Sequence, residues 1–480
     1  MTLRDHTSDR CSRSLEEEAV QGEQELGAAD LKGQEGRGSL GVEVKATWRL
    51  AGPVVVAQLG MMTMGLVDVL MVGPLGAEAL AAVSLGNSIF FAAGIFCAGI
   101  IMALDTMVSQ AVGAGKLARA GGLFWQATWL ALAMGLLLNL AFLDLEWLLL
   151  LLRQDEAVAK LSTSYMTARS FAAVPFLIFA SCRGLLNGIG RTRPVMIVTL
   201  AANILNLLAD AVLIHGFLGA PALGVVGAGI ATSIVRWFML GAVVLVLFHS
   251  SLAHLALKPR MPRFSEARRI VALGLPIGLQ LLAEVGVFSA TGILVGWLGA
   301  VSLAQHQIAL TCVSFAFMVP LGIGVAANVR VGQAVGRGDP AAAMRAGKVA
   351  LGLGMGFMLF PSILFLLMPT VFVRAFTSDP EVIAGAAMLL RIAVVFQLAD
   401  GLQAVAAGSL RGAADMRTPL LANLFSHWMV GLPLGAFLAF GLGWGASGFW
   451  WGLTVALVLV GTALTAVFFK GGWRRRGRVV

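Results

Sequence analysis

The sequence predicts an all-α membrane protein with twelve transmembrane helices in two homologous six-helix lobes. Three observations support this fold class: the composition, the regular recurrence of long apolar runs, and an internal repeat. Hydrophobic residues make up 58% of the 480 residues and charged residues only 12%, and the mean hydropathy is +0.87. Such a composition is typical of a protein that crosses the membrane many times.

Apolar runs of about 20 residues recur from residue 46 onward. A helix rises about 1.5 Å per residue, so each run is long enough to cross a hydrocarbon core of about 30 Å. We count twelve such runs, at residues 50–72, 80–104, 122–143, 163–182, 194–216, 225–248, 270–296, 303–327, 346–369, 386–410, 419–440 and 446–469.

Lys and Arg alternate between the two ends of these spans. With a cytoplasmic N-terminus, the cytoplasmic ends hold 22 of the basic residues after residue 45, and Arg236 lies inside a span. The opposite ends hold only five, Arg153, Lys160, Arg169, Arg374 and Arg391. This positive-inside bias predicts a multi-pass protein of the bacterial inner membrane with both termini cytoplasmic. The net charge of +9 therefore reflects topology, and we expect no nucleic-acid partner.

Two segments of the chain match at an offset of 223 residues. "LGAEALAAVSL" from Leu75 matches "LGAVSLAQHQI" from Leu298, and "SQAVGAGK" from Ser109 matches "GQAVGRGD" from Gly332. Six spans per half give both halves the same orientation, an arrangement typical of alternating-access carriers. Gly274 and Gly278 lie four residues apart in one span, a spacing that is expected to allow close packing against another helix.

These features divide the chain into five parts. The first 45 residues, with ten acidic and six basic residues, are expected to form a disordered cytoplasmic tail. An N-lobe at 46–248 and a C-lobe at 270–470 follow, joined by a basic cytoplasmic linker at 249–269, and 471–480 form a basic tail.

Four carboxylates lie deep in apolar sequence: Asp68, Asp210, Glu284 and Asp400. An ionisable group at this depth costs about 2.5–3.5 kcal/mol and usually faces a cavity or an ion pathway. At about 1.5 Å per residue, the first two lie roughly 7–9 Å below the outer ends of their spans, and the last two roughly 18–21 Å below. Each half is therefore predicted to hold its own pair.

Polar neighbours accompany each pair. Asn206 precedes Asp210 by one helical turn, Gln280 precedes Glu284 likewise, and Gln397 and Gln403 flank Asp400. Hard oxygen ligands of this kind suit a proton or a small cation, whereas thiolate or imidazole clusters for zinc are absent from the sequence pattern. The alternative is that each carboxylate pairs with a buried cation, but Arg236 is the only basic residue expected well inside a span. Asp105 is expected near the membrane interface.

A carboxylate removed from water holds a proton more readily, and a second acid nearby strengthens this effect. Such a pair can release its proton when another cation arrives, which is the chemistry of an antiporter. The sequence has no HExxH zinc motif, no GxxxxGK[ST] phosphate loop and no nucleophile–base motif within a span, so an enzyme or an ATP-driven pump is not expected.

The residues 46–470 resemble the multidrug and toxic compound extrusion (MATE) family, in its NorM-type branch. The motifs that carry the resemblance are "GLVDVLMVG", "NLLADAVLIHG", "LLAEVGVF", "LAQHQIAL", "VRVGQAVG" and "FQLADGLQAVAAGSLRG". The resemblance implies a V-shaped, two-lobe fold that exports cationic amphiphilic drugs and toxic organic compounds in exchange for Na⁺ or H⁺ by a rocker-switch mechanism. It also implies no cofactor beyond the coupling ion.

Carried over by motif, Glu284 and Asp400 correspond to a C-lobe cation site that could hold Na⁺, and Asp68, Asn206 and Asp210 to an N-lobe proton or Na⁺ site. Members of the branch often have Asn in place of Asp210 and Tyr in place of Phe396. These differences leave open which lobe binds the coupling ion and whether that ion is Na⁺ or H⁺. Candidates for a substrate cavity, for which packing in the core is the alternative, are Gln58, Asn203, Gln280, Phe288, His306, Phe396, Gln397 and Gln403.

The expected substrates are small organic cations, and the expected state is a monomer in the lipid bilayer. A flippase for lipid-linked precursors, from the same superfamily, is the main alternative, but it should carry several cationic side chains to bind a diphosphate. A channel is a further alternative, which concentrative transport would exclude.

Overall fold

The structure is a computed structural model that describes residues 40–219, 221–250, 259–475 and 479, and this part of the chain forms helices and no strands. Residues 1–39 of the predicted tail at 1–45, residue 220, the centre of the linker at 251–258 and residues 476–478 and 480 lie outside the described residues. Among the described residues the first helix begins at Leu40, so residues 40–45 of the predicted tail are helical and the N-lobe starts ahead of the predicted boundary at residue 46.

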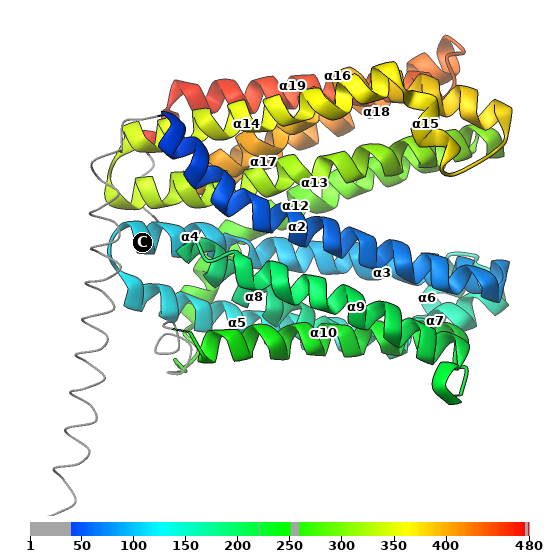
Figure 1. Cartoon of the computed structure of the whole chain (residues 1–480), viewed down its shortest axis with the longest axis horizontal. Helices are drawn as coiled ribbons and strands as arrows, with labels where there is room; N and C mark the ends of the chain where they lie inside the picture. Colours follow the sequence, from blue (N-terminus) through cyan, green and yellow to red (C-terminus); the bar gives the residue numbers. More distant parts are fainter. Residues whose placement is uncertain (1–39, 220, 251–258, 476–478, 480) are drawn as a thin grey trace, which may run out of the picture.

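The first half of the chain forms the N-lobe (Figure 1). Its helices are α2 (Leu40–Val72), α3 (Ala77–Ile101), α4 (Ala103–Gly113), α5 (Leu117–Ala141), α6 (Glu146–Leu151), α7 (Glu156–Ser170), α8 (Ala173–Ile189), α9 (Arg193–His215) and α10 (Gly224–Phe248), with short turns η1 (Gly73–Leu75) and η2 (Phe217–Gly219). Helices α7 and α8 together form one span, which bends by 47° between them.

The second half forms the C-lobe. Its helices are α12 (Phe264–Gly296), α13 (Ala300–Arg337), α14 (Pro340–Leu367), α15 (Pro369–Arg374), α16 (Pro380–Gly412), α17 (Arg417–Asn423), α18 (Leu432–Ala436) and α19 (Ala446–Lys470). Two π-helical segments, η3 (Leu424–Gly431) and η4 (Phe437–Gly441), continue α17 and α18, and η5 (Gly472–Arg475) ends the lobe. Eleven helical stretches in the described residues can each cross a membrane, and the bent α7–α8 pair makes twelve, as predicted.

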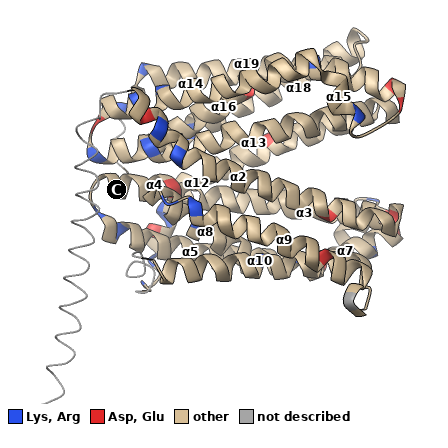
Figure 2. Ribbon diagram, in the orientation of Figure 1, with Lys and Arg blue, Asp and Glu red and all other residues tan. Residues whose placement is uncertain are grey.

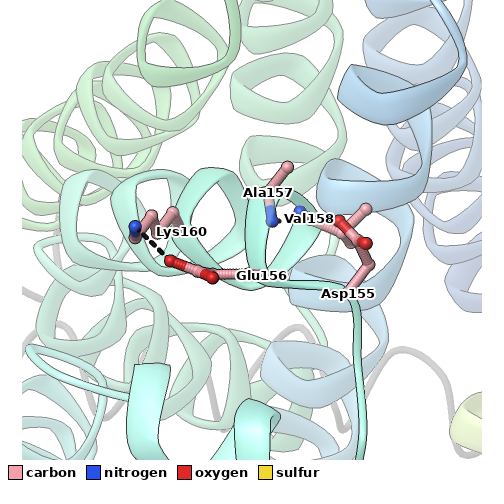
Figure 3. Close-up of polar contacts among 5 residues, drawn as sticks. All are labelled: Asp155, Glu156, Ala157, Val158 and Lys160. Carbon is pink, nitrogen blue, oxygen red and sulfur yellow. Dashed lines mark hydrogen bonds and ion pairs between the residues drawn. The ribbon is translucent and has the colours of Figure 1, made fainter.

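Acidic side chains begin several of these helices. Asp155 Oδ1 accepts hydrogen bonds from the backbone N–H groups of Ala157 (2.9 Å) and Val158 (3.4 Å), and so caps α7 (Figure 3). One residue later, Glu156 forms a 2.6 Å ion pair with Lys160, one helical turn along (Figure 3). The cap satisfies N–H groups that have no partner within the helix, which fixes the start of α7 after the loop.

Each lobe has an apolar core of its own. In the C-lobe, α16 lies at the centre and packs against α13, α14 and α19, around the buried rings of Phe396, Phe449 and Trp450. In the N-lobe, α8 packs against α4, α5 and α10. The two cores are joined where Ala51 and Val55 of α2 belong to the C-lobe core and Ile270 of α12 belongs to the N-lobe core.

The two lobes meet near one end of the molecule, where Lys and Arg residues gather (Figure 2); we call this the basic end, and the opposite end the far end. Helix α2 packs against α13, and α3 packs against α12. A Cβ atom on Gly274 of α12 would lie 2.0 Å from the carbonyl oxygen of Ile100 of α3, so only glycine allows this approach. Toward the far end the lobes diverge (Figure 1), and Ile293 and Trp297 of α12 are 65% and 73% exposed.

Polar contacts also join the lobes at the basic end. Arg330 of α13 pairs with both carboxylate oxygens of Glu43 of α2, at 2.9 and 2.8 Å. Val479 donates its N–H to Gln110 Oε1 of α4 at 3.0 Å, and its carbonyl accepts from Arg269 of α12. Helices α2 and α4 belong to the N-lobe and α12 and α13 to the C-lobe, so these contacts stabilise closure of the basic end.

Three charged side chains are more deeply buried than the sequence predicts. Arg169 is 7% exposed, Arg411 is 9% exposed and Asp105 is 3% exposed. Burial within the protein is a separate property from depth in the membrane, so the interfacial position of Asp105 and the position of Arg236 inside a span stay predictions. The burial is tertiary: Arg169 packs on the Phe90 ring within the N-lobe, whereas the other two residues lie where the lobes cover each other.

Candidate cation sites

The N-lobe cluster forms where α2 packs against α9. Asn206 Nδ2 donates to Asp68 Oδ1 at 3.0 Å and to Asp210 Oδ2 at 3.1 Å, so one amide bridges two carboxylates. Asn206 and Asp210 lie four residues apart on one face of α9 and are fully buried, and Asp68 is half-buried. The structure thus brings together the three residues that the sequence singled out in this lobe.

Two oxygen atoms of this cluster are buried without a hydrogen-bond donor, Asp210 Oδ1 and Asn206 Oδ1. Buried acceptors without a partner are costly, and a proton or a small cation would satisfy them. The charges of both carboxylates also act on the buried Tyr165, whose hydroxyl accepts a hydrogen bond from Arg169. The Arg169 guanidinium lies 4.6 Å from the centroid of the Phe90 ring. A cation–π contact of this kind offsets part of the cost of burying its charge.

The C-lobe cluster forms between α12, α16 and the helix that continues into η3. Gln403 Nε2 donates to Glu284 Oε1 at 3.3 Å, and Asn423 Nδ2 donates to Glu284 Oε2 at 3.5 Å. Asp400 is 6% exposed, and the charge of Glu284 acts on it. The predicted C-lobe pair is therefore close enough to interact electrostatically.

Two neutral oxygen atoms beside Glu284 are buried without hydrogen-bond donors, the side-chain oxygens of Gln403 and Asn423. The side-chain oxygen of Gln397, three residues before Asp400 on α16, is buried without a donor as well. Carboxylate and amide oxygens are the ligands that hard cations prefer. Within the described residues no three His, Cys, Asp or Glu side chains come together as a metal site would require, so each cluster offers at most two carboxylates.

None of the four carboxylates is locked to a basic partner. In the described ranges, no ion pair between Lys or Arg and an acidic side chain includes Asp68, Asp210, Glu284 or Asp400. The alternative that buried cations neutralise them by direct pairing thus has no support in this part of the chain. Arg236 lies over the Phe176 ring instead, 5.2 Å from its centroid.

The other candidate residues fall into two groups. Gln280 is 2% exposed and accepts a 2.9 Å hydrogen bond from Arg411, and Asn203 bonds the carbonyl of Thr199 within its own helix, so neither bonds to a carboxylate. Phe396 and His306 are 2% and 1% exposed in the C-lobe core. The half-buried Phe288 packs on Phe396, at a centroid separation of 6.3 Å, and Gln58 is half-buried on α2.

Sequence reasoning missed Asn423 as a neighbour of Glu284. A signal was available, because Asn423 precedes His427 by one turn, which places two polar residues on one face of an apolar span. Both are fully buried, and the His427 ring nitrogen Nδ1 lies 3.3 Å from the Asn423 carbonyl oxygen. Trp428, the next residue, donates to the carbonyl of Ala283 at 3.1 Å and so fixes η3 against α12.

A groove of about 1030 Å³ opens elsewhere, on the surface of the N-lobe between α7 and α10. Its lining includes Phe171, Ile234 and Trp237 and none of Asp68, Asp210, Glu284 and Asp400. The polar clusters and this surface groove are therefore separate features.

Two repeated helix bundles that meet at one end, each with a pair of carboxylates inside its membrane spans, define a two-lobe membrane transporter. The family model MatE matches residues 53–212 and 276–437, which begin 223 residues apart, the offset of the internal repeat. The chain therefore belongs to the MATE family and is a transporter of the NorM type, as the motifs predict.

Curated relatives agree with this assignment. The chain is 39% identical over 442 residues to the "Probable multidrug resistance protein NorM" of Pseudomonas putida, covering 90% of this chain and 95% of the relative. It is 39% identical over 423 residues to the "Multidrug resistance protein NorM" of Burkholderia vietnamiensis, covering 86% and 91%.

Solved structures share the fold. A eukaryotic MATE transporter, AtDTX14, superimposes with a TM-score of 0.84 at 22% identity over 91% of this chain and 98% of that one. A MATE family transporter of the MOP superfamily, described as outward-facing, gives a TM-score of 0.81 at 19% identity over 90% and 95%. The V-shaped two-lobe fold is thus confirmed.

Proposed function

We propose that this protein is a secondary active antiporter that exports cationic amphiphilic compounds in exchange for Na⁺ or H⁺. The observation that supports the proposal is the state of its four deep carboxylates. Asp68, Asp210 and Glu284 accept hydrogen bonds from amide groups, and within the described residues none of the four makes a direct ion pair with Lys or Arg. Buried side-chain oxygens without hydrogen-bond donors belong to both clusters. A buried negative charge without a counter-ion is unstable, so each cluster favours binding of a positive group.

Exchange follows from competition for the same charge. An ion or a proton that neutralises a cluster removes the attraction for a cationic cargo, and a bound cargo removes the attraction for the ion. Binding of one cation therefore lowers the affinity for the other, which is the thermodynamic requirement for antiport. The names of the relatives, multidrug resistance proteins, support a drug-like cargo.

We further propose that the basic end faces the cytoplasm of a bacterium, in the inner membrane, and that the protein acts as a monomer. The positive-inside rule supports this orientation, because the sequence assigns 22 basic residues to the cytoplasmic ends of the spans and five to the opposite ends. The conformation described here, closed at the basic end, is then the outward-facing one, and a rocking motion of the lobes opens the other side.

The test is efflux of ethidium, a fluorescent organic cation, from proteoliposomes on which a pH gradient and a Na⁺ gradient are imposed separately. Wild type should concentrate ethidium against its gradient with one of the two ions, which also excludes a channel. Asp68→Asn, Glu284→Gln and Asp400→Asn should each slow this transport. Glu78→Gln, at an exposed position near the start of α3, is the matched control.

If all three variants transport ethidium at the wild-type rate, the carboxylates do not couple ethidium export to the ion gradient and the proposal fails. If wild type moves a lipid-linked diphosphate across the bilayer and ethidium not at all, the flippase alternative replaces it.

A further inference from the structure

Arg411 lies in the last turn of α16, between the C-lobe cluster and the contact of the two lobes. Its side chain is buried, and its Nη2 donates to Gln280 Oε1 at 2.9 Å. Gln280 lies one turn before Glu284 on α12, so this hydrogen bond holds the guanidinium beside the C-lobe cluster. The Nε atom of Arg411 is buried without an acceptor.

Two carboxylates, one from each lobe, compensate this buried charge. The charges of Glu284 in the C-lobe and Asp105 in the N-lobe both act on Arg411. Asp105 is buried as well, and its Oδ1 atom has no hydrogen-bond donor. Arg411 is therefore held between two negative groups without a direct ion pair to either in the described residues.

The backbone of the same turn forms contacts between the lobes. The Arg411 carbonyl accepts a hydrogen bond from Thr106 of α4 at 3.1 Å, and the Gly412 carbonyl accepts one from Gln110 of α4 at 3.0 Å. The Thr106 hydroxyl also lies 2.9 Å from Asn328 Oδ1 of α13. One turn of α16 thus bonds Gln280, one helical turn before Glu284, through the Arg411 side chain, and bonds the N-lobe through its backbone.

We propose that Arg411 is a positioning residue that links occupancy of the C-lobe cluster to opening of the lobes at the basic end. The inference rests on the proposed function, because it requires a cation to bind at Glu284. While the cluster is empty, Glu284 compensates the buried guanidinium and the closed basic end is stable. When a cation binds, Glu284 no longer compensates Arg411, and burying Arg411 between the lobes becomes less favourable.

The direction of the effect follows from comparing the two conformations. Separation of the lobes at the basic end would expose Arg411 to water, where its charge needs no partner. A cation on Glu284 therefore destabilises the closed basic end more than the open one, and the population shifts toward opening. By linkage, cationic cargo binds more weakly in the conformation described here than in the open one, as export requires.

The experiment measures the distance between the lobes at the basic end by double electron–electron resonance in lipid nanodiscs. Spin labels replace the exposed Lys116 in the N-lobe and Arg345 in the C-lobe, in a background in which the native cysteines 11, 97, 182 and 312 are replaced and efflux is retained. The probes are NaCl against N-methylglucamine chloride, and ethidium. In wild type we expect the ratio of open to closed states to rise roughly 5-fold or more with a bound cation.

Arg411→Gln should leave this ratio unchanged when the cation binds, and Arg411→Lys should restore part of the response. Arg417→Gln removes an exposed arginine six residues further on and should respond like wild type. Because Arg411→Gln could simply misfold, Thr106→Val provides an independent variant: it removes a hydrogen bond to the Arg411 carbonyl and should raise the open population without any cation.

Direct binding of ethidium and Na⁺, measured in parallel, distinguishes failure of the proposed function from failure of the role proposed for Arg411. If wild type binds neither probe through Glu284, the proposed function fails and the inference fails with it. If both bind and the ratio in Arg411→Gln shifts as in wild type, or the ratio in wild type does not shift at all, the proposed function stands and the role of Arg411 is overturned.

Discussion

Asn206 joins α9 to α2 by donating a 3.0 Å hydrogen bond to Asp68, while the same amide group bonds Asp210 within its own helix. We predict that Asn206→Leu, which keeps the shape of the side chain and removes both donors, impairs the N-lobe cluster. A hydrogen bond to a charged group contributes about 1.5–3 kcal/mol, so gradient-driven ethidium efflux should fall roughly 10-fold or more.

Thr199→Val is the control for this change, since Thr199 is a buried polar residue of the same helix whose hydroxyl donates to the carbonyl of Val195. Equal efflux by the two variants would mean that the amide bridge between the carboxylates has no part in transport.

In the C-lobe, Gln403 and Glu284 form a pair that a double-mutant cycle can test. Gln403→Ala should weaken cation binding because Glu284 loses its 3.3 Å donor and the cluster loses a neutral oxygen. The effect should nearly vanish in the Glu284→Gln background, giving an interaction energy of about 0.5–3 kcal/mol in ethidium or Na⁺ binding by calorimetry. Additive effects would show that the two residues act separately.

The approach of α3 and α12 depends on the absence of a side chain at Gly274. We predict that Gly274→Leu holds the lobes apart at the basic end, since even a Cβ atom would lie 2.0 Å from the Ile100 carbonyl oxygen. The spin-label distance between positions 116 and 345 should lengthen without any cation. Gly352→Leu, in α14 where a Cβ would contact nothing within 4 Å, should leave that distance as in wild type.

The N-cap of α7 gives a prediction about stability. Asp155→Ala removes the acceptor for the N–H groups of Ala157 and Val158 and should destabilise the protein by about 1 kcal/mol. In detergent, the midpoint of thermal unfolding should fall by a few °C at most. Asp155→Asn retains a capping oxygen and should be close to wild type, whereas a similar loss in both variants would argue against the cap.

Much of the fold could be predicted from sequence because the bilayer imposes simple rules. A span needs about 20 apolar residues, and basic residues stay on one side, so hydropathy and charge place the helices and their direction. The N-lobe cluster could also be predicted in part, since Asn206 and Asp210 share a helix face four residues apart.

The rest depends on tertiary packing that no local pattern encodes. Asn423 reaches Glu284 from another helix, at the start of a π-helical segment, and the wider turns of such a segment change which residues share a face. Arg411 is buried because α4 of the other lobe covers the end of α16. Neither contact can be read from the spacing of polar residues in one span.

The contact of Val479 with Gln110 and Arg269 bears on how the protein should be handled in the laboratory. Any sequence fused after residue 480 starts two residues beyond Val479, which contacts both lobes. A purification tag or fluorescent reporter at that end would crowd this contact between the lobes, so both should be attached at the N-terminus.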